Sequence, residues 1–174
     1  NFRGTISNGT FQGILHNDSG TISGGTFKEA VEVNAASGTE ATIEGGTFEK
    51  RVTLKRSDTP ITISNGLFNG EVVAEECYAP LSITGGYFVN EPTLPEGSDT
   101  RFTTVSDQSY RAFHVRVNGD FSENGYSKLY VPCGSSEQPN TITVKTNTKL
   151  LYYLADGERF PVLDSDSDSY IYQI

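Results

Sequence analysis

Short apolar–polar alternations recur along the first half of the chain. The heptad TISGGTF at residues 21–27 has near copies at residues 5–11, 42–48, 62–68 and 82–88. Its isoleucine column comprises Ile6, Ile22, Ile43, Ile63 and Ile83, and its phenylalanine column comprises Phe11, Phe27, Phe48, Phe68 and Phe88. Both columns step by 16, 21, 20 and 20 residues, which indicates a structural repeat because two residue types keep one register.

Within each repeat the alternation predicts short strands with one buried face. Residues 61–63 read Ile-Thr-Ile and residues 31–33 read Val-Glu-Val, the period-two pattern of half-buried strands. A third apolar column follows the first four phenylalanines by four residues, at Leu15, Val31, Val52 and Val72. A repeat of about 20 residues cannot enclose a core alone, so like strands must stack in parallel about 4.8 Å apart. We therefore predict an all-β fold with a parallel β-solenoid, or β-helix, of about five coils.

Each heptad also carries a glycine at a predicted corner. These are Gly9, Gly25, Gly46, Gly66 and Gly86, each preceded by Asn or Gly, which is typical of a turn with positive φ. The same dipeptides occur in β-hairpins, so a sandwich of hairpins is the rival interpretation. The constant period favours the solenoid, because hairpins do not require Phe always to align with Phe.

The repeat ends near Val89, and the remaining sequence is different in kind. Short runs rich in Val, Ile, Thr and Tyr follow without a common offset. We predict a solenoid at residues 1–90 and, at residues 91–174, a small irregular or antiparallel β unit that caps the solenoid's C-terminal end. No cap is evident at the N-terminus, where the chain starts part-way through a coil, without an initiator Met or a leader. This open coil predicts either missing upstream residues or head-to-tail self-association.

Charge and composition exclude several classes of partner. The chain has 22 acidic and 13 basic residues, a net charge of -9 that argues against nucleic acid. No apolar run approaches the roughly 20 residues needed to cross a bilayer, so membrane insertion is not expected. Cys77 and Cys133 leave open either one disulfide or two separate thiols, and no Cys/His cluster indicates zinc.

The sequence predicts no catalytic, metal or cofactor site. Polysaccharide-processing solenoids gather several carboxylates on one outward sheet face. Glu44 is the one acid in the aligned strand columns, and three further acids fall on turns of single coils: Asp18, Asp58 and Glu76. The two histidines, His16 and His114, have no companion residues and are interpreted as surface or partly buried groups.

Several surface features have a structural interpretation that we favour over a functional one. The hydroxyl column Thr5, Thr21, Thr42, Thr62 and Ser82 resembles ice-binding faces, but Glu44 interrupts the adjacent column. A further outward position changes from Thr10 to Leu67 and Tyr87. Thr and Ser are also usual on exposed strands.

The remaining motifs are short. DSDSDS at residues 164–169 matches half of a calcium loop but has Ser169 where that loop needs Gly, so an acidic turn is favoured. Asn8 and Asn17 begin glycosylation sequons. Seven of the nine tyrosines follow Val89, and we favour half-buried strand positions over ligand contacts for them: Tyr110, Tyr126, Tyr130, Tyr152, Tyr153, Tyr170 and Tyr172.

The repeated TISGGTF, TIEGGTF and SITGGYF segments resemble the Gly-Gly-Thr-Phe type repeats of large bacterial cell-surface proteins and, more loosely, the β-helical stalks of adhesins. The resemblance covers Thr5 to Phe88. It implies an exported cell-surface module used for attachment or as a rigid spacer, and it carries over no catalytic residue. We therefore predict a non-enzymatic extracellular module for adhesion or rigid structural presentation. As a binding module it would take a glycan or protein ligand, and the sequence assigns no ligand-binding residue. The main alternative is a self-assembling, filament-type subunit. A polysaccharide-processing enzyme and an ice-binding protein are less favoured.

Overall fold

The fold was analysed in a computed structural model. It describes residues 3–35, 38–55, 58–79, 81–106, 112–134, 140–146, 152–155, 158–165 and 170–173. Beyond residue 151 it describes backbone and the side chain of Ile171. All elements assigned in these residues are strands, which confirms the all-β prediction. The described part contains no helix long and apolar enough to cross a membrane.

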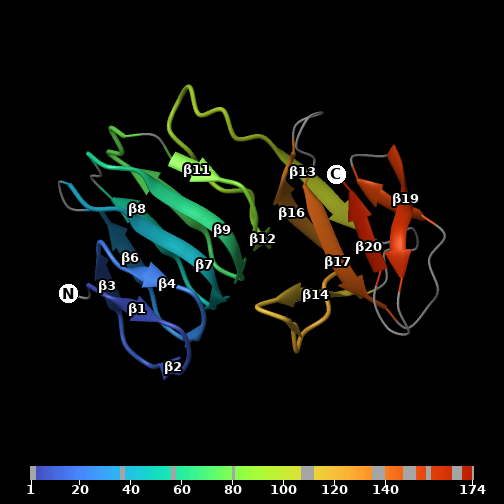
Figure 1. Cartoon of the computed structure of the whole chain (residues 1–174), viewed down its shortest axis with the longest axis horizontal. Helices are drawn as coiled ribbons and strands as arrows, with labels where there is room; N and C mark the ends of the chain where they lie inside the picture. Colours follow the sequence, from blue (N-terminus) through green and yellow to red (C-terminus); the bar gives the residue numbers. More distant parts are fainter. Residues whose placement is uncertain are drawn as a thin grey trace.

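The N-terminal half is a parallel β-solenoid with three strand positions in each coil. The first position holds β1 (Thr5–Ile6), β4 (Thr21–Ile22), β7 (Ala41–Phe48), β9 (Ile61–Phe68) and β11 (Leu81–Ile83). The second holds β2 (Thr10–Phe11), β5 (Thr26–Phe27), the ends of β7 and β9, and β12 (Tyr87–Phe88). The third holds β3 (Leu15–Asp18), β6 (Val31–Asn34), β8 (Val52–Lys55) and β10 (Val72–Glu75). The coils run from blue to green in Figure 1, and the five heptads bound about four turns.

Strand register follows the sequence repeat. Thr21 pairs with Thr5 and with Thr42, and Phe27 pairs with Phe11 and with Phe48, all in parallel ladders. In the third position Val31 pairs with Leu15 and Val52. Like residues therefore stack on like, as the constant period predicts.

The phenylalanine column forms a continuous stack inside the solenoid. Successive ring centroids from Phe11 to Phe88 are 5.0, 4.9, 4.7 and 4.6 Å apart, and the rings are parallel to within 9°. These distances match the spacing of strands in a sheet, so one hydrogen-bond register fixes both backbone and rings. The isoleucine and valine columns complete this first core, in which Ile22, Ile43 and Val52 are fully buried.

The corner glycines have the predicted backbone conformation. All five heptad glycines have positive φ, for example +102° at both Gly25 and Gly46. A Cβ at Gly25 would also lie 3.2 Å from the carbonyl oxygen of Gly9 in the coil below. The corner thus selects glycine through its backbone angle and through close stacking.

The C-terminal half is an antiparallel β unit. Its strands are β13 (Phe102–Ser106), β14 (His114–Val117), β15 (Asp120–Phe121), β16 (Lys128–Pro132), β17 (Thr141–Lys145), β18 (Tyr152–Ala155), β19 (Glu158–Ser165) and β20 (Tyr170–Gln173). They are hydrogen-bonded in the order β16-β13-β18-β19-β20-β17-β14-β15.

This unit closes part of the solenoid's C-terminal end. Phe88 in β12 pairs with Tyr130 in β16, which joins the parallel and antiparallel strands into one sheet. The ring of Phe102 packs edge-on against Phe88 at 5.5 Å and ends the phenylalanine stack. Thr93 pairs with Val73 and adds one more rung to the third sheet position.

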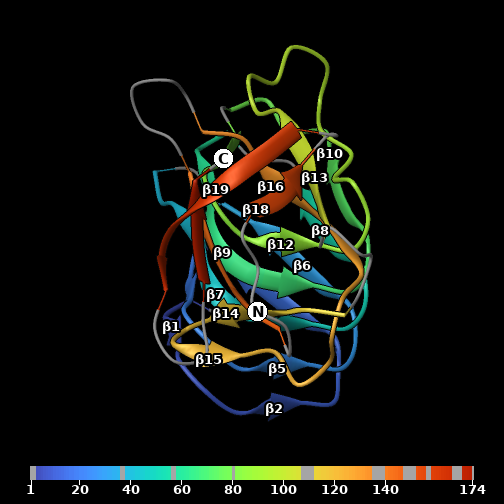
Figure 2. The same ribbon diagram turned by 90° about the vertical axis from the view of Figure 1, so that its right-hand side faces the viewer.

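The unit also lies along one side of the solenoid. In Figure 2, β14 and β15 lie over early coils near β5, whereas β16 lies near β12. A second core joins the two halves and includes Leu67 and Tyr87 from the solenoid. The predicted boundary at residue 90 therefore does not separate one core from the other. The lateral contact exists because these two outward side chains are large and apolar, unlike the threonines of earlier coils.

Candidate functional site: the interface between solenoid and C-terminal unit

The principal site is the interface along which the C-terminal unit packs on the solenoid. Leu67 and Tyr87 occupy the outward position that holds Thr10, Thr26 and Thr47 in earlier coils. The backbones of Leu67 and Tyr87 pair with each other in neighbouring coils. Leu67 is 3% exposed and Tyr87 is 8% exposed. They pack with residues of four strands and the adjoining loop: Val105, Phe113, Val115, Leu129, Val131, Ile142 and Val144.

Three polar contacts extend this interface along the solenoid. Asn118 Nδ2 donates to the carbonyl oxygen of Ser23 at 2.6 Å, and Asn140 Nδ2 donates to that of Thr84 at 3.1 Å. The hydroxyl of Tyr126 donates to Asn69 Oδ1 at 2.8 Å, and its burial raises the pKa of Tyr126. The contacts reach from the second heptad to the fifth, so the unit is held at several points along the stack.

Asn118 enters a space left by the glycines that precede the corners. A Cβ at Gly45 would lie 1.9 Å from Asn118 Oδ1, and one at Gly24 would lie 3.1 Å from Asn118 Nδ2. Asn118 itself has a φ of +52°, in the left-handed region that Asn adopts more readily than most residues. The Gly-Gly pair of the repeat therefore also accommodates the C-terminal unit.

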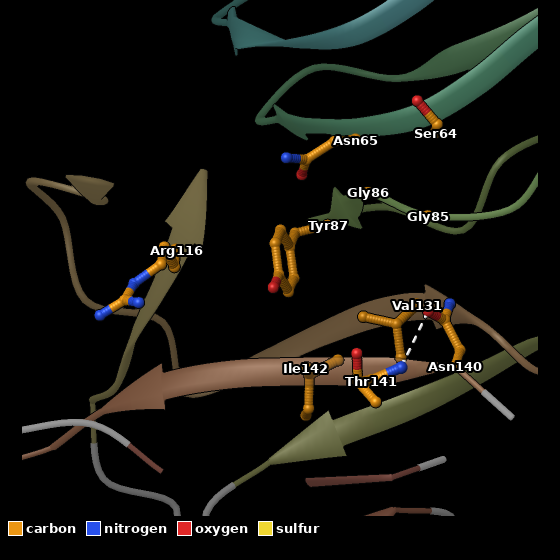
Figure 3. Close-up of a pocket in the computed structure, with 10 residues that line it drawn as sticks. All are labelled: Ser64, Asn65, Gly85, Gly86, Tyr87, Arg116, Val131, Asn140, Thr141 and Ile142. Atoms are coloured by element: carbon orange, nitrogen blue, oxygen red, sulfur yellow. Dashed lines mark hydrogen bonds between the residues drawn. The ribbon is translucent and has the colours of Figure 1, made fainter. Parts of the chain in front are cut away.

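A cavity of about 260 Å³ lies within the interface. Its ten lining residues come from the last two heptads, β14, β16 and β17: Ser64, Asn65, Gly85, Gly86, Tyr87, Arg116, Val131, Asn140, Thr141 and Ile142. Figure 3 shows the Tyr87 ring between Asn65 and the Thr141–Ile142 segment. Most of these lining groups are polar and uncharged.

Two titratable side chains line this cavity, Tyr87 and Arg116. Burial raises the pKa of Tyr87, so its phenol stays protonated at neutral pH. Arg116 is the one charged residue of the lining, and its guanidinium carbon lies 4.8 Å above the ring centre of Phe121. Figure 3 shows this guanidinium turned away from Tyr87. Besides this one cation, the cavity presents amides, hydroxyls and an aromatic ring.

The acids and histidines considered in the sequence do not assemble into a site. In the described residues no group of three or more His, Cys, Asp or Glu side chains could hold a metal ion. His16 Nδ1 lies 2.8 Å from Glu32 Oε2 on the surface, and His114 Nδ1 lies 2.7 Å from the carbonyl oxygen of Ser122. Both histidines are thus surface or partly buried groups, as predicted.

A charged ladder on the third sheet position was not predicted from the sequence. Glu32 in β6 contacts Lys55 Nζ in β8 at 2.8 Å as well as His16 in β3. The hydrogen bond from Lys55, despite partial desolvation, lowers the pKa of Glu32. Lys28 pairs with Glu49 in the next coil in the same cross-coil manner. The sequence signal is opposite charges in neighbouring coils, 16 residues apart for His16 and Glu32, 21 for Lys28 and Glu49, and 23 for Glu32 and Lys55.

The hydroxyl column has the predicted register. Thr21 Oγ1 lies 3.1 Å from Thr42 Oγ1 in the neighbouring coil, so these two hydroxyls form a hydrogen bond between coils. Glu44 is exposed and lies opposite Asn65, where the register shifts.

The two sequons differ in accessibility. Asn17 is fully buried and donates through Nδ2 to the carbonyl oxygen of Gly20 at 3.1 Å, so its amide is not available for glycosylation in the folded chain. Asn8 is exposed, and its Oδ1 accepts from the backbone N–H of Gly9.

Both cysteines are thiols in the structure. Cys77 Sγ donates to the carbonyl oxygen of Leu54 at 3.3 Å, and Cys133 is exposed.

Other sequence predictions fall partly outside the described residues. Tyr110 and residues 166–169 of the acidic run lie outside them, as do the side chains of Tyr152, Tyr153, Tyr170 and Tyr172. Tyr126 and Tyr130 are half-buried in or beside strands, which agrees with the structural interpretation for these two.

Fold and interface together define a class of protein, a parallel β-solenoid that carries an antiparallel β unit on its side and end. Comparisons with protein-family models, curated proteins and solved structures gave no match to this chain.

Proposed function

We propose that this chain is a non-enzymatic module of the extracellular surface, in which the solenoid holds the C-terminal β unit in a fixed position for adhesion or structural presentation. The resemblance of its repeats to those of bacterial surface proteins supports the surface location. A stacked solenoid suits this role because each coil is fixed by the next, which makes a stiff support.

One observation carries the proposal: the two halves share a core. Leu67 and Tyr87 replace the repeat's threonine in the two coils whose outward side chains join the second core, and both are buried there. Burying such side chains contributes about 1.5–3 kcal/mol each. A tether between independent domains would need neither this substitution nor the polar contacts from Asn118 and Asn140.

Calorimetry of an interface variant tests this coupling. The double variant Leu67→Thr/Tyr87→Thr gives both coils the residue of the first three coils, so solenoid stacking is retained while the shared core is lost. We expect one cooperative thermal transition in the original chain, and an earlier, separate transition of the C-terminal unit in the variant. The loss should be about 4 kcal/mol or more, because two large buried side chains are truncated.

Val73→Thr is the matched control. Val73 is a half-buried residue on the third sheet position, outside the shared core, and its backbone pairs with Thr53 and Thr93. It should leave a single transition near that of the original chain. Two independent transitions in the original chain, unchanged in the double variant, would overturn rigid presentation.

A further inference from the structure

The interface cavity has the features of a ligand site rather than of a packing defect. Its volume of about 260 Å³ lies just below the range typical of sites for drug-sized ligands, so it suits a ligand with one ring. The cavity opens to the surface, where Ser64 and Thr141 are exposed, and amides and hydroxyls make up much of its lining.

Three polar groups of the lining are available for a ligand. Neither the exposed hydroxyls of Ser64 and Thr141 nor the Nδ2 of Asn65 bonds to another residue in the part of the chain that the structure describes. Asn65 is held in place because its Oδ1 accepts from the backbone N–H of Gly66 at 2.8 Å. This bond leaves the Nδ2 amide as a preorganised donor.

Other lining groups are already engaged in the structure. Asn140 Nδ2 donates to the carbonyl oxygens of Thr84 and Pro132, and its Oδ1 accepts from the backbone of Thr141. Asn140 therefore holds the wall of the cavity, and Thr141 is fixed next to it with its hydroxyl unused. Val131 and Ile142 lie beside Thr141, and Tyr87 lies between this segment and Asn65; each of these three side chains is buried and forms part of the cavity wall.

This combination selects the ligand's chemistry. A purely apolar ligand would leave the polar groups unsatisfied, which costs binding free energy. An anion would meet one cation of the lining, Arg116, whose guanidinium stacks on Phe121, while the net charge of -9 repels it. A cation would meet no carboxylate among the ten lining residues.

We propose that the cavity binds one ring of a neutral saccharide. A sugar ring offers hydroxyls to Ser64, Asn65 and Thr141, and its C–H groups meet the part of the wall that Tyr87 forms. This inference adds a ligand class to the proposed presentation function, and it rests on that function only through the interface that forms the cavity.

A nuclear magnetic resonance titration with free sugars tests the proposal. The probes are glucose, galactose, mannose and N-acetylglucosamine, with glucuronate as the anionic comparison. We expect at least one neutral sugar to bind with a dissociation constant of about 1–10 mM, since a small ligand gains little free energy per atom. The shifted amide signals should be those of residues 64–66, 85–87 and 140–142.

The variant Ser64→Ala/Thr141→Val removes the two unused hydroxyls without changing the shape of the cavity. It should weaken binding by about tenfold or more, because each lost hydrogen bond contributes to affinity. The control Thr62→Val/Ser82→Ala alters the outer hydroxyl column instead and should bind as the original chain does.

Several results would overturn the saccharide site. They are the absence of shifts with every neutral sugar, shifts confined to the outer hydroxyl column, equal binding by the cavity variant, and tighter binding of glucuronate. None of these would affect the calorimetric coupling of the two halves, so the presentation function is judged separately.

Discussion

At the residue scale, the two positions of each Gly-Gly pair require glycine for different reasons. The second has positive φ, as at Gly25 and Gly46. The first is limited by contact: a Cβ at Gly24 would lie 2.3 Å from the carbonyl oxygen of Ser7. Asn replaces the first glycine at Asn8, in the first heptad, and at Asn65, where the register shifts opposite Glu44.

Gly45 offers a test of this contact constraint. In Gly45→Ala the new methyl group would collide with the Asn118 side chain and displace it from Ser23. We expect a loss of about 1–3 kcal/mol in the free energy of unfolding, measured by urea denaturation. Adding Asn118→Gly removes the colliding side chain. In that background Gly45→Ala should lower the free energy of unfolding by less.

Gly13→Ala is the matched control, because a Cβ at Gly13 would have no heavy atom within 4 Å outside its chain neighbours. It should change stability by less than about 0.5 kcal/mol. Equal losses at Gly45 and Gly13 would refute the docking role of the Gly-Gly pair.

At the element scale, the inward apolar columns form the core of the solenoid, and the outward side chains make smaller contributions to its stability. The third strand position carries the charged ladder of His16, Glu32 and Lys55, one residue on each of three neighbouring strands. Glu32 lies between two groups that favour its ionised form, and its pKa is lowered, with the Lys55 hydrogen bond as the largest cause. Because these side chains are about a third exposed or more, solvent screening keeps the contribution small.

The pH dependence of Glu32→Gln follows from this direction. A carboxylate with a lowered folded-state pKa stabilises the fold above its unfolded pKa, and this stabilisation is lost as pH falls through the folded value. At pH 7 the original chain should be more stable than Glu32→Gln by less than about 1 kcal/mol. The difference should shrink below about pH 4.5, the region of the ordinary Glu value.

Urea denaturation at several pH values measures this difference, with Glu44→Gln as a control at an exposed acid outside the ladder. For Glu44→Gln the difference should not follow the same pH course. A Glu32→Gln effect that persists unchanged in acid would exclude the ionic contribution of the ladder.

The elements also show what the sequence could predict. The solenoid was predictable because its contacts repeat at one offset, so Phe27 and Phe48 must meet once the coils stack. The antiparallel unit has no such constraint, and its strand order pairs β13 with β16 and β18 across long sequence separations. Its type was predictable from composition, but its pairing was not.

At the scale of the whole molecule, the interface was visible in the sequence only as an irregularity. The change from Thr47 to Leu67 and Tyr87 interrupts the outward column, and in the sequence alone it indicates only a departure from an ice-binding face. The structure gives its cause, since these are the positions that the C-terminal unit buries. A departure from a repeat can therefore indicate a position that another part of the chain buries.

The cavity could not be predicted for a related reason. Its walls come from heptads near residues 64–66 and 85–87 and from strands β14, β16 and β17, which no spacing rule brings together. Asn65 and Thr141 are ordinary polar residues in the sequence. Their proximity is a consequence of how the unit packs on the side of the solenoid.

The central claim is that solenoid and C-terminal unit form one rigid body, and amide residual dipolar couplings in a single alignment medium test it most directly. We expect one alignment tensor to fit the couplings of both halves in the orientation of Figure 1, because the shared core and the contacts of Asn118 and Asn140 fix that orientation. Two tensors of different magnitude would show that the halves move independently and would contradict rigid presentation.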